Sequence, residues 1–425
     1  MISQGHRLEG SSPMSSTRTF IVVGGGLAGA KTAEALRAKD FDGSIILLSE
    51  EDHLPYERPP LSKEHFAGKK ALADFIVHRG DWYRDHHVDL RLGTAATALD
   101  LAAHTVTLPD GSTLSYDKLA LATGSRSRRP PISGSDAAGV HYLRTVDESD
   151  ALIEAVGEHG RLVVIGAGWI GLEVGASARE RGADVTLVEA AEVPLSGSIG
   201  PEIGTVFAEL HREHGVHLHL AAKVEEILVE HGRATGVRLG DGTVLPADAV
   251  LVAVGAAPNI ELAEQAGLDV DGGGVLVDAG LQSSDPDVVA VGDIAAHLHP
   301  RLGTRIRVEH WANALNQPAV AAATMLGHTA HYDNLPYFFT DQFDLGMEYV
   351  GYAPHDSYDR VIVRGDYATR EFIAFWLDSG NRVLAGMNVN IWDVTDQIKQ
   401  LVSSSAPVDP DRLADPAVPL VDVSG

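Results

Sequence analysis

Two glycine-rich turns, each placed between an apolar strand and a helix, are the residues of this chain best suited to do chemistry. Each turn carries three glycines in the GxGxxG spacing: Gly24, Gly26 and Gly29 in the first, and Gly166, Gly168 and Gly171 in the second. In this spacing the first glycine allows a tight turn, the second lets the backbone approach a pyrophosphate, and the third lets the helix pack on the strand. The free N–H groups at the start of the helix then face the phosphates.

An acidic residue follows each turn at the end of the next apolar run. Glu50 and Glu189 are placed to accept hydrogen bonds from the hydroxyls of a ribose. A single GxGxxG is weak evidence, because an ordinary glycine-bearing turn also fits it, but two complete fingerprints predict two dinucleotide sites. Glu189 is followed by Ala190 and Ala191 instead of an arginine, so the second site suits a 2′-hydroxyl and favours NADH over NADPH.

Length and composition exclude several classes of protein. The chain has 425 residues, 44% of them hydrophobic and 22% charged, which predicts two or three soluble globular domains. The net charge of −26 argues against nucleic acid or an anionic membrane as a partner. No apolar run approaches the ~20 residues that span a bilayer. We therefore expect a cytoplasmic protein.

The chain contains no cysteine. An internal redox disulfide, a sulfenic acid and thiolate ligation of a metal or iron–sulfur cluster are therefore excluded. The 20 histidines include two close pairs, His297 with His299 and His328 with His331, in sequence that looks polar and loop-like. We expect these histidines to be solvated and predict no metal site.

The rest of the chain predicts an α/β fold with two Rossmann-like domains and a C-terminal α+β domain. Asp-Gly pairs at 110–111 and 241–242 indicate equivalent hairpins in the two halves. The strand within 287–295 has no earlier counterpart and must complete one of the two sheets. The predicted segments are a disordered extension (1–17), a first dinucleotide domain (18–149 and 272–330), a second (150–271), an aromatic α+β domain (331–403) and a mobile tail (404–425).

Three short motifs carry a resemblance to a known family. The segments RPPLSK (58–63), VGDIA (291–295) and VEHWANALNQ (308–317), together with both fingerprints, resemble the FAD-dependent, NADH-using ferredoxin and rubredoxin reductases of oxygenase electron-transfer chains. Apoptosis-inducing factor is a more distant relative. The resemblance covers residues 18–403 and implies a fold of the glutathione-reductase type, with FAD in the first domain and NADH in the second.

The resemblance also implies site residues. In the first domain and its return segment the cofactor-binding candidates are Gly24, Gly26, Leu27, Ala28, Gly29, Glu50, Arg58, Lys63, Ala122, Thr123, Gly124, Arg129, Gly292, Asp293, Glu309, His310 and Trp311. In the second domain they are Gly166, Gly168, Ile170, Gly171, Glu189 and Gly255. Some of these residues also fit a purely structural role: a solvated turn for Arg58 and Lys63, a helix N-cap for Asp293 and a core aromatic for Trp311.

Lys63 and Glu173 are the catalytic candidates. In related flavoproteins a glutamate at this place pairs with the lysine beside the flavin, so we expect Lys63 and Glu173 to pair; a glutamate on the helix surface is the alternative. The chain departs from the family at YFFTDQ (337–342), where Phe339 stands at a position that commonly holds tryptophan.

The implied activity is ferredoxin reduction. By resemblance, hydride passes from NADH to FAD, and single electrons pass to a two-iron ferredoxin or a rubredoxin that feeds a haem or Rieske-type oxygenase. The alternatives are an NADH-responsive sensor or an NADH oxidase of the apoptosis-inducing-factor type, although oxidases of this kind use a cysteine that is absent here. Either a monomer or a homodimer is compatible. Two arginine clusters could meet an acidic ferredoxin: Arg126, Arg128 and Arg129, and Arg301, Arg305 and Arg307.

Overall fold

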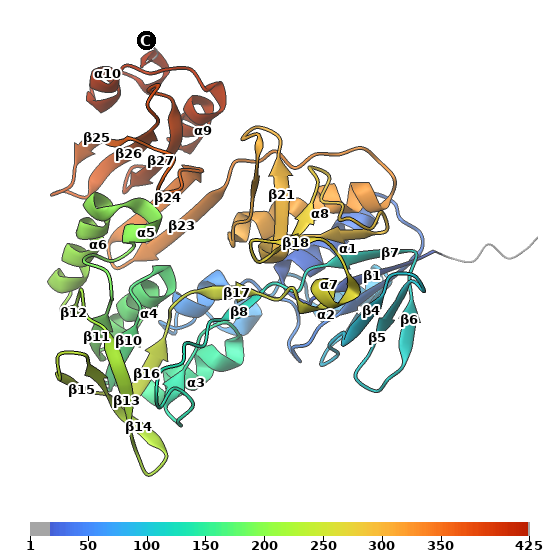
Figure 1. The fold of residues 1–425 in the computed structure, drawn as a ribbon, viewed down its shortest axis with the longest axis horizontal. Helices are drawn as coiled ribbons and strands as arrows, with labels where there is room; N and C mark the ends of the chain where they lie inside the picture. The colour runs from blue at the N-terminus through green and yellow to red at the C-terminus, as the bar shows by residue number, and fades with distance from the viewer. Residues whose placement is uncertain (1–17, 424–425) are drawn as a thin grey trace, which may run out of the picture.

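The computed structural model describes residues 18–423, which form three parts (Figure 1). The extension predicted for 1–17 lies outside the described residues. In Figure 1 the first part lies on the right, the second at the lower left and the third at the upper left. Two parts are built on parallel sheets and the third on an antiparallel sheet. The predicted α/β fold with a C-terminal α+β domain is confirmed.

The first part is a five-stranded parallel sheet in the order β20-β7-β1-β2-β3. Its strands are β1 (Thr19–Val23), β2 (Ser44–Leu48), β3 (Val88–Arg91), β7 (Lys118–Leu121) and β20 (Val288–Ala290). The apolar side chains of β7 and β20, and those of β1, are buried on both faces, as parallel strands covered by helices require. Helices α1 (Leu27–Ala38) and α8 (Trp311–Met325) pack against each other and contact β7. Strand β20 shows that the segment 287–295 completes this first sheet.

The second part repeats the plan, with the strand order β12-β11-β10-β16-β9. Its strands are β9 (Val140–His141), β10 (Arg161–Ile165), β11 (Asp184–Val188), β12 (His217–His219) and β16 (Ala249–Val252). Its helices are α3 (Val146–Val156), α4 (Trp169–Glu180), α5 (Ser196–Ile199) and α6 (Pro201–Glu213).

The two glycine turns have the same backbone geometry. Gly24 has a φ of 121° and Gly166 a φ of 104°, which side chains disfavour. A Cβ on Gly24 would lie 2.1 Å from the carbonyl oxygen of Ala122, and one on Gly166 would lie 2.5 Å from that of Ala253. Each turn therefore packs directly on the loop that follows the neighbouring strand, and only glycine fits.

Smaller antiparallel sheets extend both parts. Asp110 and Gly111 connect β5 to β6, and Asp241 and Gly242 connect β14 to β15, so the two predicted hairpins are confirmed. The strands concerned are β4 (Ala98–Asp100), β5 (Thr105–Thr107), β6 (Thr113–Ser115), β13 (Val224–Glu230), β14 (Arg233–Leu239) and β15 (Val244–Pro246). A further sheet, in which β19 and β21 pair in parallel, contains β18 (Val270–Asp271), β19 (Gly274–Val277), β21 (Ala295–His299) and β22 (Thr304–Ile306).

The second part begins and ends earlier than the predicted limits of 150 and 271. Strand β9 already pairs with β16, while α7 (Glu261–Ala266) packs against β4 of the first part. The chain crosses between the parts at β8 (Ser125–Ser127) and β17 (Ala256–Pro258), which pair side by side near the middle of the molecule (Figure 1). The chain passes from one part to the other at this pairing. No change in amino-acid composition marks the place in the sequence.

The third part is an antiparallel sheet in the order β23-β24-β27-β26-β25 with α9 (Thr395–Ser404) against it. Its strands are β23 (Tyr337–Gln342), β24 (Leu345–Gly351), β25 (Arg360–Asp366), β26 (Glu371–Leu377) and β27 (Val383–Val389).

The tail predicted to be mobile from 404 is instead packed on the third part, as far as residue 423. It forms α10 (Pro410–Ala414) and a short 3-10 turn, and it buries Leu413 and Val423 completely. The guanidinium of Arg364 donates to the carbonyl oxygens of Asp415 and Val418, both at 2.6 Å. The Pro- and Asp-rich composition misleads because the tail is held by long-range contacts that its own sequence does not reveal.

Candidate functional site

A cavity of about 1000 Å³ lies where the three parts meet. Its walls come from the first glycine turn, the segment 58–63, the starts of α4 and α8, and β23. The candidates that line it are Gly24, Gly26, Leu27, Ala28, Glu50, Arg58, Lys63, Ala122, Thr123, Gly124, Arg129, Ile170, Glu173, Gly292, Asp293, Glu309, His310 and Trp311. Those outside its lining are Gly29, Gly166, Gly168, Gly171, Glu189 and Gly255.

The start of α1 faces the cavity as an open anion site. Gly26 caps the helix in an extended conformation without a side-chain cap bond, and the first turn carries no acidic residue. Apart from Gly26 and its two neighbours in the chain, no described residue has an atom within 4 Å of the place where a Cβ on Gly26 would stand. The unsatisfied N–H groups and the positive end of the helix dipole are therefore free for a phosphate.

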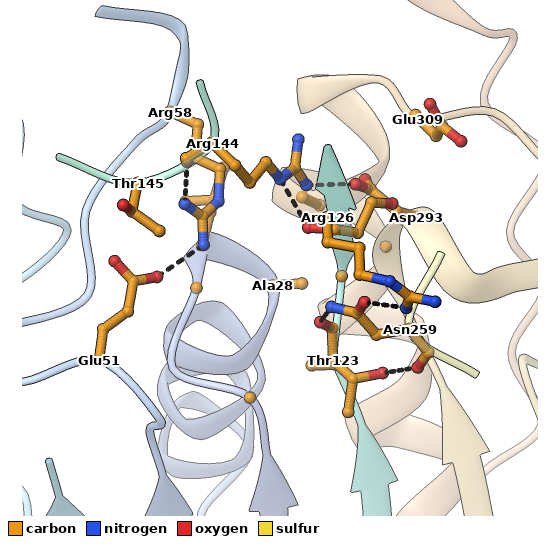
Figure 2. Close-up of a pocket in the computed structure, with 18 of the residues that line it drawn as sticks. Ala28, Glu51, Arg58, Thr123, Arg126, Arg144, Thr145, Asn259, Asp293 and Glu309 are labelled. Atoms are coloured by element: carbon orange, nitrogen blue, oxygen red, sulfur yellow. Dashed lines mark hydrogen bonds and ion pairs between the residues drawn. The ribbon is translucent and has the colours of Figure 1, made fainter. Parts of the chain in front are cut away.

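Arg58 is held at the cavity wall by a fixed set of partners. Its Nη2 lies 2.8 Å from Glu51 Oε1, and its Nη1 donates to the carbonyl oxygen of Arg144 (Figure 2). The Tyr56 hydroxyl donates to the other oxygen of Glu51 at 2.5 Å. Because both carboxylate oxygens of Glu51 are engaged, the guanidinium of Arg58 is restrained. These contacts do not match the alternative in which Arg58 belongs to a solvated turn.

Asp293 lines the cavity in an ion pair with a residue that no motif indicates. Arg144 Nη2 lies 2.5 Å from Asp293 Oδ2, and Arg144 Nε donates to the carbonyl oxygen of Ser125 at 2.8 Å (Figure 2). The short 3-10 helix here begins at Gly292 and is capped by Val291, so Asp293 is not its N-cap.

The loops after β7 and β17 are tied together. The Thr123 hydroxyl donates to the carbonyl oxygen of Asn259 at 2.6 Å, and the Asn259 amide donates to the carbonyl oxygen of Thr123 at 2.9 Å (Figure 2). Arg126 reaches the Asn259 side chain at 2.7 Å. This reciprocal pair holds the crossing between the two dinucleotide parts next to the cavity.

Aromatic rings form the wall of the cavity toward the third part. The Trp311 indole donates to Glu57 Oε2 at 3.1 Å, and its ring is nearly perpendicular to that of Phe339, with centroids 6.0 Å apart. Trp311 is partly exposed in the cavity lining, which distinguishes it from a core aromatic. Lys63 Nζ lies 4.7 Å from the Phe339 centroid, a cation–π distance. Phe339 thus supplies an aromatic face without an indole N–H.

Lys63 and Glu173 come together at the centre of this wall. Nζ of Lys63 lies 3.7 Å from Oε1 of Glu173, and each side chain is less than a tenth exposed. Glu173 is buried on α4 and is not a helix-surface glutamate. The catalytic role of the pair stays a prediction.

The second glycine turn repeats the features of the first. Gly168 caps α4 without a side-chain bond, and the position of its missing Cβ is open among the described residues. Glu189 accepts hydrogen bonds from the backbone N–H groups of Ala167 at 2.8 Å and Ala191 at 2.9 Å. The carboxylate is thereby fixed beside the turn.

Two buried polar atoms at the cavity have no partner among the described residues. These are Nδ1 of His310 and the hydroxyl oxygen of Ser125, and both residues line the cavity. Desolvation lowers the pKa of His310 to about 4, so its ring is neutral at pH 7. Orphaned polar atoms are costly unless a ligand satisfies them, so the cavity fits a large polar ligand.

The expectation of solvated histidines is wrong for one of the two pairs. His297 and His299 lie in β21, 1% and 0% exposed, whereas His328 and His331 are exposed. No cluster of metal-ligating side chains occurs within residues 18–423. Most arginines of the two clusters have partners within the chain. Arg126 pairs with Glu261, Arg301 with Asp333 and Arg307 with Glu309, while Arg128 and Arg305 donate to backbone carbonyls. Arg126 and Arg301 remain 55% and 49% exposed, and Arg129 lies over the ring of Tyr142, so their role toward a ferredoxin stays a prediction.

The sequence indicated neither Arg144 nor Thr340 as part of the site. Arg144 stands just before the N-cap residue of α3, and Thr340 is one of several polar residues in β23. No local pattern marks either, because their partners, Asp293 and Glu173, lie more than 140 residues away in the chain.

Two dinucleotide-binding sheets, an anion site at each glycine turn and one shared cavity define a two-nucleotide oxidoreductase. The chain belongs to the pyridine nucleotide-disulphide oxidoreductase family, whose model matches residues 18–318, and a reductase C-terminal model matches residues 337–424. Membership implies FAD and a pyridine nucleotide as cofactors, and the open helix starts, Arg58 and the orphaned atoms fit them. The family name refers to a disulphide, but this chain has no cysteine.

Its relatives include ferredoxin reductases. It is 40% identical, over 95% of this chain and 99% of the relative, to the ferredoxin–NAD(+) reductase component of the anthranilate 1,2-dioxygenase system of Burkholderia cepacia. It is 38% identical to putidaredoxin reductase CamA of Pseudomonas putida, over 96% of this chain and 97% of the relative.

Among solved structures, the covalent putidaredoxin reductase–putidaredoxin complex matches with a TM-score of 0.91 and 36% identity, over 96% of this chain and 98% of that chain. The ferredoxin reductase of the CYP199A2 system from Rhodopseudomonas palustris matches with a TM-score of 0.90 and 35% identity, over 96% of this chain and 100% of that chain. Within residues 18–423, no helix has both the length and the apolar character needed to cross a membrane.

Proposed function

We propose that this chain is a cytoplasmic ferredoxin reductase that takes hydride from NADH into bound FAD and delivers single electrons to a two-iron ferredoxin serving an oxygenase. The flavin supplies the chemistry when bound, since it accepts two electrons together and releases them singly. A rubredoxin is the other carrier compatible with the chain. The terminal oxygenase is of the haem or Rieske type, and the protein is a monomer or homodimer.

One observation carries the proposal: a single cavity reaches both the first glycine turn and the start of α4, in a chain without cysteine. Two nucleotides can therefore meet there, yet no thiol in the chain can accept the electrons. The acceptor must be another molecule. Its relatives include a ferredoxin reductase component of a dioxygenase system and a reductase solved in complex with putidaredoxin, which supports a ferredoxin in that place.

The residues of the cavity take distinct roles in this function. With FAD bound, the start of α1 and Arg58 would hold its pyrophosphate, and Asp293 would bond its ribityl chain. Lys63 would face the flavin, where its ammonium would favour the gain of negative charge. Trp311 and Phe339 cover the edge of the site and exclude water.

NADH is the proposed reductant because of Glu189. Its carboxylate is fixed by two backbone N–H groups, so it can accept from a ribose 2′-hydroxyl without reorganisation. A 2′-phosphate at the same place would face a like charge that cannot turn away.

Anaerobic stopped-flow mixing tests the proposal. The purified yellow protein is mixed with NADH or NADPH, and the reduced protein is then mixed with each of a panel of two-iron ferredoxins and rubredoxins, with ferricyanide as a control acceptor. Fast bleaching by NADH, slower bleaching by NADPH and rapid reoxidation by a ferredoxin are expected. Reoxidation by ferricyanide alone would overturn the electron-transfer role and favour the sensor.

A further inference from the structure

Glu173 is held from all three parts of the chain. Its Oε2 accepts from the Ser62 hydroxyl of the first part at 2.5 Å, while Oε1 accepts from the Thr340 hydroxyl of β23 at 2.7 Å. Lys63 Nζ approaches the same Oε1 at 3.7 Å. Each carboxylate oxygen therefore has a hydroxyl donor of its own, and the rotation of the carboxylate is fixed.

The hydrogen bonds continue behind Thr340, away from the cavity. Gln342 Nε2 donates to Thr340 Oγ1 at 3.2 Å, and His211 Nε2 donates to Gln342 Oε1 at 2.9 Å. Thr340, Gln342 and His211 are at most 1% exposed, and none of them lines the cavity. They form a buried polar line from α6 through β23 to α4.

The donor and the acceptor of each hydrogen bond in this line can be assigned in only one way. An ionised carboxylate accepts hydrogen bonds and cannot donate, so the Thr340 hydroxyl must donate to Glu173 and accept from Gln342. The oxygen of Gln342 is then left to accept from His211, whose other ring nitrogen, Nδ1, is buried without a partner among the described residues. Burial lowers the pKa of His211 to about 4, so it is neutral at pH 7.

On the basis of the proposed function, we propose that Thr340, Gln342 and His211 are positioning residues that keep Glu173 ionised and aimed at Lys63. The three aligned dipoles all present their positive ends toward the carboxylate, where burial strengthens their effect. The C-terminal part and α6 thereby set the charge that faces the nucleotides, although neither Gln342 nor His211 touches them.

The charged surroundings of Glu173 are few. Lys63 is the direct counter-ion of Glu173. Its charge also acts on the carboxyl groups of Glu64, in the same segment, and Asp341, in β23. Burial raises the pKa of Asp341, partly offset by Lys63. Ser62 is neutral, and so is His211 at pH 7. Removal of the Thr340 hydroxyl therefore leaves Glu173 with the Ser62 hydroxyl and the Lys63 ammonium as its partners.

The test is the pH dependence of the midpoint potential of the bound flavin, measured by spectroelectrochemistry without turnover. In Thr340→Val the side chain keeps its shape but loses the donor to the carboxylate, so the break in the curve of potential against pH moves up by about one pH unit or more. Thr340→Ser restores the wild-type break. Gln342→Leu shifts it in the same direction by less.

Thr324→Val is the matched control, because the Thr324 hydroxyl also donates one hydrogen bond, to the carbonyl oxygen of Gly280, but Thr324 does not line the cavity. Thermal unfolding establishes that each variant is folded, and His211→Phe replaces Thr340→Val if that variant is not. Folded variants with an unmoved break, or an equal shift in the control, overturn the proposal. A wild-type protein that NADH does not reduce overturns the proposed function instead, since the electrode measurement needs no NADH.

Discussion

Arg144 and Asp293 form a 2.5 Å ion pair across the cavity wall, although they lie 149 residues apart in the chain. Asp293 follows β20, and Arg144 directly precedes the N-cap of α3. The pair therefore joins the return segment of the first part to the entrance of the second. Arg144 also reaches the carbonyl oxygen of Ser125, at the crossing strand β8.

Removal of this cation is expected to destabilise the protein. In Arg144→Met the mostly buried carboxylate of Asp293 loses its partner, at a cost of about 2 to 4 kcal/mol in the free energy of unfolding. Urea unfolding measures the change. The double variant with Asp293→Asn should recover part of the loss, and strictly additive losses would contradict the coupling.

Lys63 and Glu173 are expected to act on electron transfer more than on cofactor retention. Lys63→Met removes a positive charge from the cavity wall, so flavin reduction by NADH should slow at least about tenfold and the flavin midpoint potential should fall. Lys63→Arg should retain most of the potential. A Lys63→Met protein that reduces its flavin at the wild-type rate would remove Lys63 from the mechanism.

Glu189 is expected to set the choice of nucleotide. Glu189→Ala removes both the acceptor for a ribose hydroxyl and the charge that repels a phosphate, so the ratio of kcat/KM for NADH to that for NADPH should fall about tenfold or more. Steady-state ferricyanide reduction with each nucleotide measures the ratio. Glu50→Ala, in the first fingerprint, is the control and should leave this ratio unchanged.

Buried neutral histidines are expected to make the protein sensitive to acid. Burial lowers the pKa of His211 and of His297 to about 4, below the usual 6.5, so the unfolded chain binds more protons between these values. The contribution of each neutral histidine to the free energy of unfolding is fully present above pH 6.5. It falls by about 1.4 kcal/mol per pH unit as the pH is lowered toward 4.

Urea unfolding at pH 7 and at pH 5 measures this dependence. His297→Leu should lose about 1 to 2 kcal/mol less than the wild type between the two values. His355→Leu changes a side chain that is 72% exposed and should follow the wild type. An unchanged slope in His297→Leu would show that protonation of His297 does not oppose folding.

Arg364 is expected to hold the C-terminal segment in place. Its guanidinium bonds several carbonyl groups between 413 and 418, so Arg364→Met should cost about 1 to 3 kcal/mol and expose that segment to protease. Limited proteolysis with mass spectrometry locates the cleavage. Arg84→Met, at a side chain that is 74% exposed, should be cut no faster than the wild type.

The parts of the fold that the sequence predicts well are those set by neighbouring residues. The turns at Gly24 and Gly166 and the hairpins at 110–111 and 241–242 depend on local backbone conformation, which residue types at fixed spacing disclose. Strand β20 is predictable for the same reason, because its apolar run ends at a glycine.

Contacts between distant segments could not be predicted in this way. Arg144 and Thr340 have ordinary neighbours, and their roles arise only when domain packing brings Asp293 and Glu173 to them. His297 was expected in solvent because short polar sequence looks like a loop, yet β21 is buried between its neighbours. Nor does the sequence disclose that Arg126 pairs with Glu261 and Arg301 with Asp333.

Strand β23 has a practical consequence for the engineering of chimeric reductases. The C-terminal part looks like a cassette that could be exchanged between homologues to change the electron acceptor, since it has its own sheet and a continuous sequence. It also donates the Thr340 hydroxyl to Glu173, so an exchange that brings a residue without a donor alters the active centre along with the surface. A graft beginning after Gln342 would retain the native donor and let the two effects be separated.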